Sequence, residues 1–155
     1  MEKTNVARIF DRNKIDYKYY ESDCPQAISG VEVAQILGKD PRAVFKTLVT
    51  VGKSRKNYVF VIPVGAELDL KKAAAAAREK SMEMLKLKDL LPTAGYVHGG
   101  CSPVGMKKFF KTSIDSSANG LEIITFSAGK IGFQVETSLA ELAKVIEFSV
   151  ADLCV

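Results

Sequence analysis

The chain has 155 residues, of which 47% are hydrophobic and 26% are charged, and its 22 basic and 18 acidic side chains give a formal net charge of +4. This composition excludes disordered, collagen-like and disulfide-scaffold proteins, and the length predicts a single domain over residues 1–155. The small positive charge does not by itself indicate a nucleic-acid partner, although it would not oppose contact with phosphates.

Neither a membrane span nor a secretory leader is expected. The longest stretch without a charged side chain, residues 90–106, contains Pro92, Pro103 and four glycines, which would interrupt a spanning helix. Charged residues near the N-terminus stand where a secretory signal would be apolar. We therefore expect a cytoplasmic protein.

Few side chains are suited to disulfides or to metal binding. Cys24, Cys101 and Cys154 form no pairing motif, and His98 is the only histidine. These residues are too few for a disulfide framework or a structural zinc site. Reduced thiols are expected, and neither a metal nor a cofactor is predicted.

The N-terminal half alternates between helix and strand patterns. In chain order we expect a helix capped by Thr4 or Asn5, a short strand at 16–21, a helix from Ser29 to Gly38, a helical turn at Asp40-Pro41, and strands at 44–51 and 58–64. The polar segment 53–57 joins the last two strands and predicts a hairpin.

The C-terminal half contains an irregular segment between regular elements. We expect a helix from Asp69 through Ala77, a short helix around Asp89 before Pro92, strands near 107–114, 121–126 and 131–136, and a helix from Ser138 through Val145. Glycine and proline make 95–105 a shaped loop. This order favours one α+β (mixed α/β) domain, with a curved mixed or antiparallel sheet or a partial barrel flanked by helices.

Lys46 is the most informative lysine. Strand alternation places it beside Val44 and Leu48, with Phe45 and Thr47 on the other face, and neither face is polar. The ammonium either extends to water or provides a positive charge in a cleft, where it could hold a phosphate, a carboxylate or a sugar hydroxyl. The pattern alone favours extension to water.

The segment Gly99-Gly100-Cys101-Ser102-Pro103 has two interpretations beyond a surface turn. Adjacent glycines let the backbone approach a ligand and expose N–H groups that can stabilise an oxyanion. Alternatively, His98 and Cys101 could form a nucleophilic dyad, although a packed cysteine is more common.

Two groups of side chains have both a functional and a structural interpretation. The tyrosines of residues 17–20 could stack on a nucleobase, but aromatic residues in strands more often pack in the core. The lysines of residues 107–111 could bind phosphates beside the glycine loop, or they could keep an edge strand soluble.

Together these segments resemble the YbaK family of bacterial aminoacyl-tRNA deacylases. The chain is most similar to the Cys-tRNA(Pro) deacylase branch, which is related to the editing domain of bacterial prolyl-tRNA synthetases. The resemblance runs from about residue 3 to 150 and rests, in order, on Val44-Phe45-Lys46-Thr47-Leu48-Val49, residues 95–105, Ile114-Asp115 and Ser127-Ala128-Gly129.

This resemblance implies an editing domain that removes a wrongly attached amino acid from tRNA(Pro), and the branch that the chain resembles implies cysteine. Lys46 matches the lysine that engages the tRNA terminus, and Gly99–Pro103 matches the backbone wall beside the ester. The implied catalytic residues are Lys46, Gly99, Gly100 and Cys101. The implied substrate-binding residues are Tyr20, Phe45, Thr47, His98, Ser102, Pro103, Ser127 and Gln134, the last standing where some relatives carry an acid.

In that branch the thiol of the substrate cysteine attacks its own ester, so no protein nucleophile, metal or cofactor is required. The alternatives are removal of alanine or another amino acid, a Cys101-dependent hydrolase, and a non-enzymatic module that binds tRNA or a nucleotide. Aminoacyl-tRNA is the expected partner and prolyl-tRNA synthetase a candidate second one. The sequence does not specify the oligomeric state.

Overall fold

The computed structural model describes residues 2–23 and 28–155, so Cys24 lies outside the described residues. The helices are α1 (Asn5–Arg12), α2 (Gly30–Leu37), α3 (Leu70–Ala77), α4 (Leu87–Ala94) and α5 (Leu139–Leu142), with short 3₁₀ helices η1 (Pro41–Ala43) and η2 (Ser116–Gly120). The strands are β1 (Lys18–Glu21), β2 (Phe45–Gly52), β3 (Asn57–Pro63), β4 (Met82–Met84), β5 (Lys111–Asp115), β6 (Ile124–Ser127), β7 (Phe133–Thr137) and β8 (Ser149–Ala151).

The strands form two sheets. A three-stranded antiparallel sheet has the order β1-β7-β6, and a five-stranded mixed sheet has the order β4-β2-β3-β5-β8. The hairpin of β2 and β3 is antiparallel, whereas β5 runs parallel to β3 and to β8. A parallel bridge between Val44 and Thr125 joins the two sheets. The predicted α+β class is confirmed, but the pairings among the described residues do not close a barrel.

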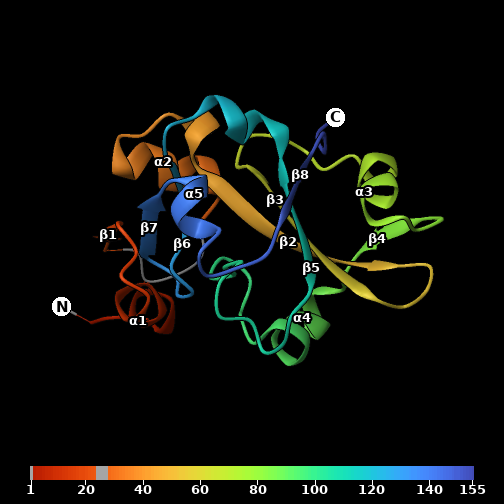
Figure 1. The fold of residues 1–155 in the computed structure, drawn as a ribbon, viewed down its shortest axis with the longest axis horizontal. Helices are drawn as coiled ribbons and strands as arrows, with labels where there is room; N and C mark the ends of the chain where they lie inside the picture. Colours follow the sequence, from red (N-terminus) through yellow and green to blue (C-terminus); the bar gives the residue numbers. More distant parts are fainter. Residues whose placement is uncertain (1, 24–27) are drawn as a thin grey trace.

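Strand β2 is covered on both faces, which explains its lack of a polar side. Phe45 and Val49 pack in the large core that also contains Phe10 and Phe126. Leu48, on the opposite face, packs against a second cluster beneath α3. Figure 1 shows β2 crossing the molecule, with α1 and the three-stranded sheet at one end and α3 at the other.

Several predicted boundaries are wrong. Helix α4 continues through Pro92 to Ala94. The proline removes one helical hydrogen bond and crowds the carbonyl of Lys88, but fully buried Ala94 packs the last turn into the core. Helix α5 ends at Leu142, short of Val145. The three-residue strands β4 and β8 were too short to be predicted from pattern.

Strand β5 begins at Lys111, later than predicted, because residues 107–110 form bends and irregular chain. The strand also pairs on both sides, with β3 and β8, so the edge-strand interpretation of its lysines is wrong. In the described part of the chain, no helix is long and apolar enough to cross a membrane.

Candidate functional site

A pocket of about 430 Å³ lies beside β2. Its walls come from the start of α2, from residues 84–90, from the loop that follows α4, from the end of β6 and from the start of β7. This volume falls within the range of roughly 300 to 1,000 Å³ that is usual for small-ligand sites. Most of the predicted site residues line it, namely Phe45, Lys46, Thr47, His98, Gly99, Cys101, Ser127 and Gln134.

The other predicted residues do not line the pocket. Gly100, Ser102 and Pro103 are buried behind its wall. Tyr20 lies on β1, where it pairs across the sheet with Gln134. The structure therefore brings Lys46 and part of the glycine loop to one cavity. The residues outside the lining can support its walls but do not face the cavity.

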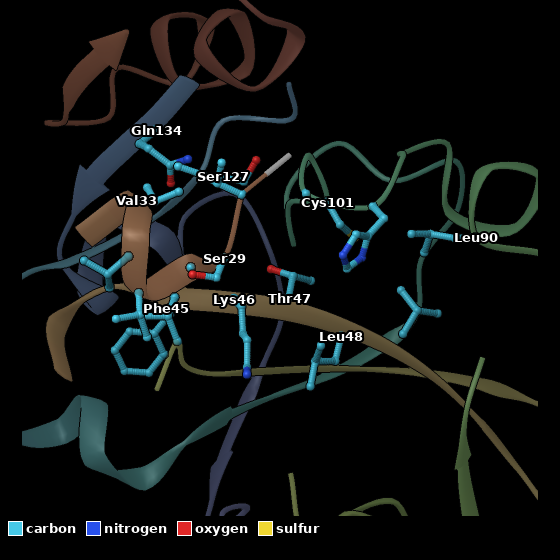
Figure 2. Close-up of a pocket in the computed structure, with 18 of the residues that line it drawn as sticks. Ser29, Val33, Phe45, Lys46, Thr47, Leu48, Leu90, Cys101, Ser127 and Gln134 are labelled. Carbon is cyan, nitrogen blue, oxygen red and sulfur yellow. The ribbon is translucent and has the colours of Figure 1, made fainter. Parts of the chain in front are cut away.

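Hydroxyl groups from separate elements line the pocket. The Thr47 Oγ1 atom is buried and has no hydrogen-bond partner among the described residues. The Ser127 Oγ accepts a bond from the Gly129 N–H at 3.1 Å, which leaves its own proton available to a ligand. Figure 2 shows Thr47 and Ser127 on the same side of β2, with Leu48 projecting to the other side. The pocket thus has one buried hydroxyl without a partner, on Thr47, and an apolar wall.

Lys46 is the lysine among the residues that line the pocket, and it contributes a positive charge. Its side chain is half-buried, and no ion pair to it is formed within the described ranges. Figure 2 shows the side chain leaving β2 in a different direction from Thr47, as strand alternation requires. Lys46 and Thr47 therefore line the pocket from opposite faces of β2, with the ammonium on the face away from the Thr47 hydroxyl.

The glycine loop is held by its own backbone. Gly99 has a φ of 86°, which a residue with a side chain rarely adopts. The Gly100 N–H donates to the Val97 carbonyl at 3.0 Å, and a Cβ on Gly100 would lie 3.3 Å from the Ile131 nitrogen. Gly100 thus lets the loop pack against the turn before β7, while Gly99 and Cys101 face the pocket.

Cys101 and His98 do not form an activated pair. The cysteine is only 9% exposed, and burial raises the pKa of its thiol to about 12. His98 is exposed, and no hydrogen bond between the two side chains appears among the described residues. A thiol that stays protonated at neutral pH is a poor nucleophile. The geometry favours Cys101 as a packed wall residue.

Helix α2 forms one wall, and its cap positions it. The Ser29 hydroxyl accepts from the Glu32 N–H at 3.2 Å, while the Glu32 carboxylate accepts from the Ser29 N–H at 3.4 Å. These two bonds form a capping box at Ser29, where the sequence predicted the helix to begin. Gly30 allows close approach, because a Cβ there would lie 2.5 Å from the Val64 Cγ1. Ser29, Gly30 and Val33 all line the pocket, which their sequence signals did not reveal.

A buried polar cluster ties the far end of α2 to the three-stranded sheet. Lys39 Nζ lies 2.5 Å from a carboxylate oxygen of Glu136, which is 5% exposed, and 4.7 Å from the centre of the Tyr20 ring. The Tyr20 hydroxyl donates to the same carboxylate at 3.2 Å. Burial lowers the pKa of Lys39, but the hydrogen bonds and charges of Glu136 and Tyr20 outweigh it and raise the pKa overall. Tyr20 thus supports the pocket wall through Glu136.

The neighbouring tyrosines also have partners within the protein. The Tyr17 ring packs edge-on against the Phe10 ring, with 5.1 Å between the ring centres. The centres of the Tyr19 and Phe133 rings are 5.8 Å apart. The core interpretation of these aromatic residues is confirmed. In residues 2–23 and 28–155, no three metal-binding side chains cluster together, and Cys101 and Cys154 are free thiols.

Comparisons with known proteins agree with this geometry. The model of the "Aminoacyl-tRNA editing domain" family matches residues 24–145. A protein of Enterococcus faecalis named "Putative Cys-tRNA(Pro)/Cys-tRNA(Cys) deacylase EbsC" is 48% identical over 136 residues, which cover 87% of this chain and 83% of that protein.

Solved structures show the same fold at lower identity. The structure of a "putative trans-editing enzyme for prolyl tRNA synthetase" has a TM-score of 0.84 and 22% identity, and the match covers 99% of both chains. That of a hypothetical protein has a TM-score of 0.89 and 20% identity, covering 98% of this chain and 100% of the other. The family model spans most of the sequence, and the Enterococcus relative is similar over nearly all of it. The chain therefore belongs to the aminoacyl-tRNA editing domain family, as its resemblance to YbaK proteins predicted.

Proposed function

We propose that this protein is a deacylase that releases cysteine from misacylated tRNA(Pro). The observation that carries the proposal is a sheltered pocket with an unpaired lysine, an unpaired hydroxyl and a backbone loop, in which the protein's own thiol is kept protonated. Family membership and the name of the Enterococcus relative support the same substrate class.

The chemistry that fits this pocket uses the nucleophile of the substrate. The sulfur of the cysteinyl group attacks its own carbonyl carbon, the ester C–O bond breaks, and the ribose oxygen leaves and takes up a proton. Water then opens the resulting thiolactone to free cysteine. Holding the reacting atoms in alignment is the protein's task, and an intramolecular attack gains most from it. The strained small ring reduces that gain.

Each part of the pocket has a role in this proposal. Lys46 binds the phosphate or ribose of the terminal nucleotide. The backbone at Gly99 lies beside the carbonyl, and Gly100 holds the loop in position. The hydroxyls of Thr47 and Ser127 bind polar groups of the aminoacyl end, while the apolar wall around Leu48 and Leu90 excludes water from the reacting atoms.

Such an activity meets a need of translation. A synthetase pocket that accepts proline cannot strongly reject a smaller amino acid, because one methylene is worth only about 1 to 3 kcal/mol. A second site that tests the attached amino acid by a different property, here its thiol, removes the error. Proline and alanine esters lack the attacking group and should survive.

Comparing three substrates tests the proposal. Cys-tRNA(Pro), Ala-tRNA(Pro) and Pro-tRNA(Pro) are incubated with the protein, and the remaining ester is measured over time. We expect rapid loss of the cysteinyl ester and near-background decay of the other two. Equal background decay of all three would contradict the proposal, while preferential loss of alanine would reassign the substrate.

The pocket does not explain selection of one tRNA, because the acylated end is common to all tRNAs. We therefore propose that prolyl-tRNA synthetase supplies this selectivity as a partner in the cytoplasm. The assay is repeated with Cys-tRNA(Cys) and Cys-tRNA(Pro), with and without the synthetase. Selectivity for Cys-tRNA(Pro) should appear only when the synthetase is present, and equal selectivity without it would remove the need for a partner.

A further inference from the structure

The two sides of the pocket mouth differ in charge. On the α2 side, Ser29 and Glu32 are exposed, and α2 contains no basic residue. On the α4 side, Met84 and Leu87 line the pocket and are 44% and 68% exposed. Exposed lysines flank Leu87 at positions 86 and 88.

The groove on the other side of the glycine loop is acidic. Its lining contains Glu2, Glu21 and Asp23, and its one lining lysine, Lys130, forms an ion pair with Glu2 at 2.5 Å. A polyanion leaving the pocket is therefore repelled on that side, and the sequence of α2 offers it no lysine or arginine.

The α4 side carries an excess of cations. Lys86 and Lys88, with Lys107 and Lys108 in the segment beside α4, outnumber the two acids Glu83 and Asp89 of the same region. Lys107 lies against α4, since its ammonium donates to the Pro92 carbonyl at 3.2 Å. Neither Lys86 nor Lys88 forms an ion pair with any described residue.

We propose, on the basis of the deacylase function above, that the RNA strand carrying the acylated nucleotide leaves the pocket across Met84 and Leu87. The adjacent unpaired base packs on these two apolar side chains, and Lys86 and Lys88 bind the phosphates on either side of it. Single-strand binding combines side chains that pack on base faces, most often aromatic ones, with cations along the backbone. Here the aliphatic side chains of Met84 and Leu87 would provide the packing surface.

Two substrates test this surface separately from the reaction. One is Cys-tRNA(Pro), and the other is adenosine carrying ester-linked cysteine, which lacks the preceding nucleotides. Lys86→Glu/Lys88→Glu should raise KM for the tRNA about tenfold. The slope of log kcat/KM against the logarithm of salt concentration should become less steep by about 1.4, the value for two single-strand phosphate contacts. Release from the adenosine ester should stay at the wild-type rate.

The chain offers a matched control. Lys71 is the second residue of α3, as Lys88 is of α4, and it also follows an exposed leucine. Helix α3 does not line the pocket, and Figure 1 shows it at a different end of the molecule from α4. Lys71→Glu should therefore retain the wild-type KM for both substrates. An acidic residue in a first helical turn is also compatible with folding.

Three other results would contradict either the exit path or the deacylase function, and each can be told from the others. If the α4 variant binds tRNA as well as the Lys71→Glu protein does, the exit path is wrong. If its defect appears only when prolyl-tRNA synthetase is added, the surface binds protein and the proposal is overturned. If the wild-type protein releases cysteine from neither substrate, the deacylase function itself fails.

Discussion

The pocket beside β2 and the groove beside Lys130 lie on either side of one loop, and their volumes are of the same order, at about 430 Å³ and about 640 Å³. Gly95, Tyr96 and Val97 face the groove, while His98, Gly99 and Cys101 face the pocket. Size alone therefore does not identify the functional cavity.

The polar groups of the two cavities differ in what they already bind. In the groove, the Lys130 ammonium pairs with Glu2 and lies 5.3 Å from the centre of the Phe133 ring. In the pocket, Lys46 and the Thr47 hydroxyl have no partner among the described residues. Buried polar groups normally have partners, so those that lack one indicate where a ligand binds.

The largest expected effect comes from removing the unpaired ammonium. Lys46→Ala should slow cysteine release from tRNA(Pro) about a hundredfold or more, the range found when one electrostatic contact to a reacting group is lost. Its thermal unfolding should change little, because Lys46 forms no ion pair with a described residue. Single-turnover deacylation and thermal melts measure the two quantities.

Lys130→Ala is the matched change in the groove. It should keep the wild-type deacylation rate, because its ammonium is already bound to Glu2. A similar loss in both variants would remove the distinction between the two cavities. A large fall in stability of Lys46→Ala would instead make this lysine structural.

A smaller effect is expected from the cluster that holds the α2 wall. Glu136→Ala leaves Lys39 and Tyr20 without their shared acceptor. It should lower the free energy of unfolding by about 2 kcal/mol, less than the roughly 3 to 5 kcal/mol for a fully buried pair, because Lys39 keeps some contact with water. Urea denaturation measures the change.

The exposed pair of Lys3 and Asp11 provides the comparison for that measurement. Both side chains are about half exposed, so Lys3→Ala should change stability by about 0.5 kcal/mol or less. If Glu136→Ala were equally mild, the cluster would contribute nothing to the position of α2.

Close packing of α2 on Val64 gives the next prediction. Gly30→Ala places a methyl group 2.5 Å from the Val64 Cγ1, so the helix must shift. We expect about 1 to 2 kcal/mol of destabilisation and a raised KM, because the pocket wall moves with the helix. Gly120→Ala, whose Cβ would meet nothing within 4 Å, should change neither. Unchanged KM in Gly30→Ala would show that α2 does not shape the site.

The smallest effect is expected at Cys101. Cys101→Ala should keep cysteine release within about threefold of wild type, since the substrate supplies the thiol, whereas a protein-nucleophile mechanism would lose it entirely. With its pKa at about 12, the folded thiol should resist iodoacetamide at pH 8, and alkylation should become faster as pH rises toward that value. Rapid labelling at neutral pH would contradict the packed role.

Local signals in the sequence determined the elements that frame the site. The caps at Thr4, Ser29 and Asp69 start their helices as predicted, and the segment 53–57 joins the predicted hairpin. Such signals act between residues a few positions apart, so they can be recognised without a fold. The ordered motifs around Lys46 and Gly99 also identified the family.

Tertiary packing decided what those elements do. Only the fold pairs β5 on both sides, carries α4 past Pro92, and joins Tyr20 and Lys39 to Glu136 across more than ninety residues of chain. Tertiary packing also decided that α2 forms a wall of the pocket. It decided as well from which face of β2 each side chain reaches the pocket. These features depend on which surfaces are buried against each other, and burial is a property of distant segments brought together rather than of a local pattern.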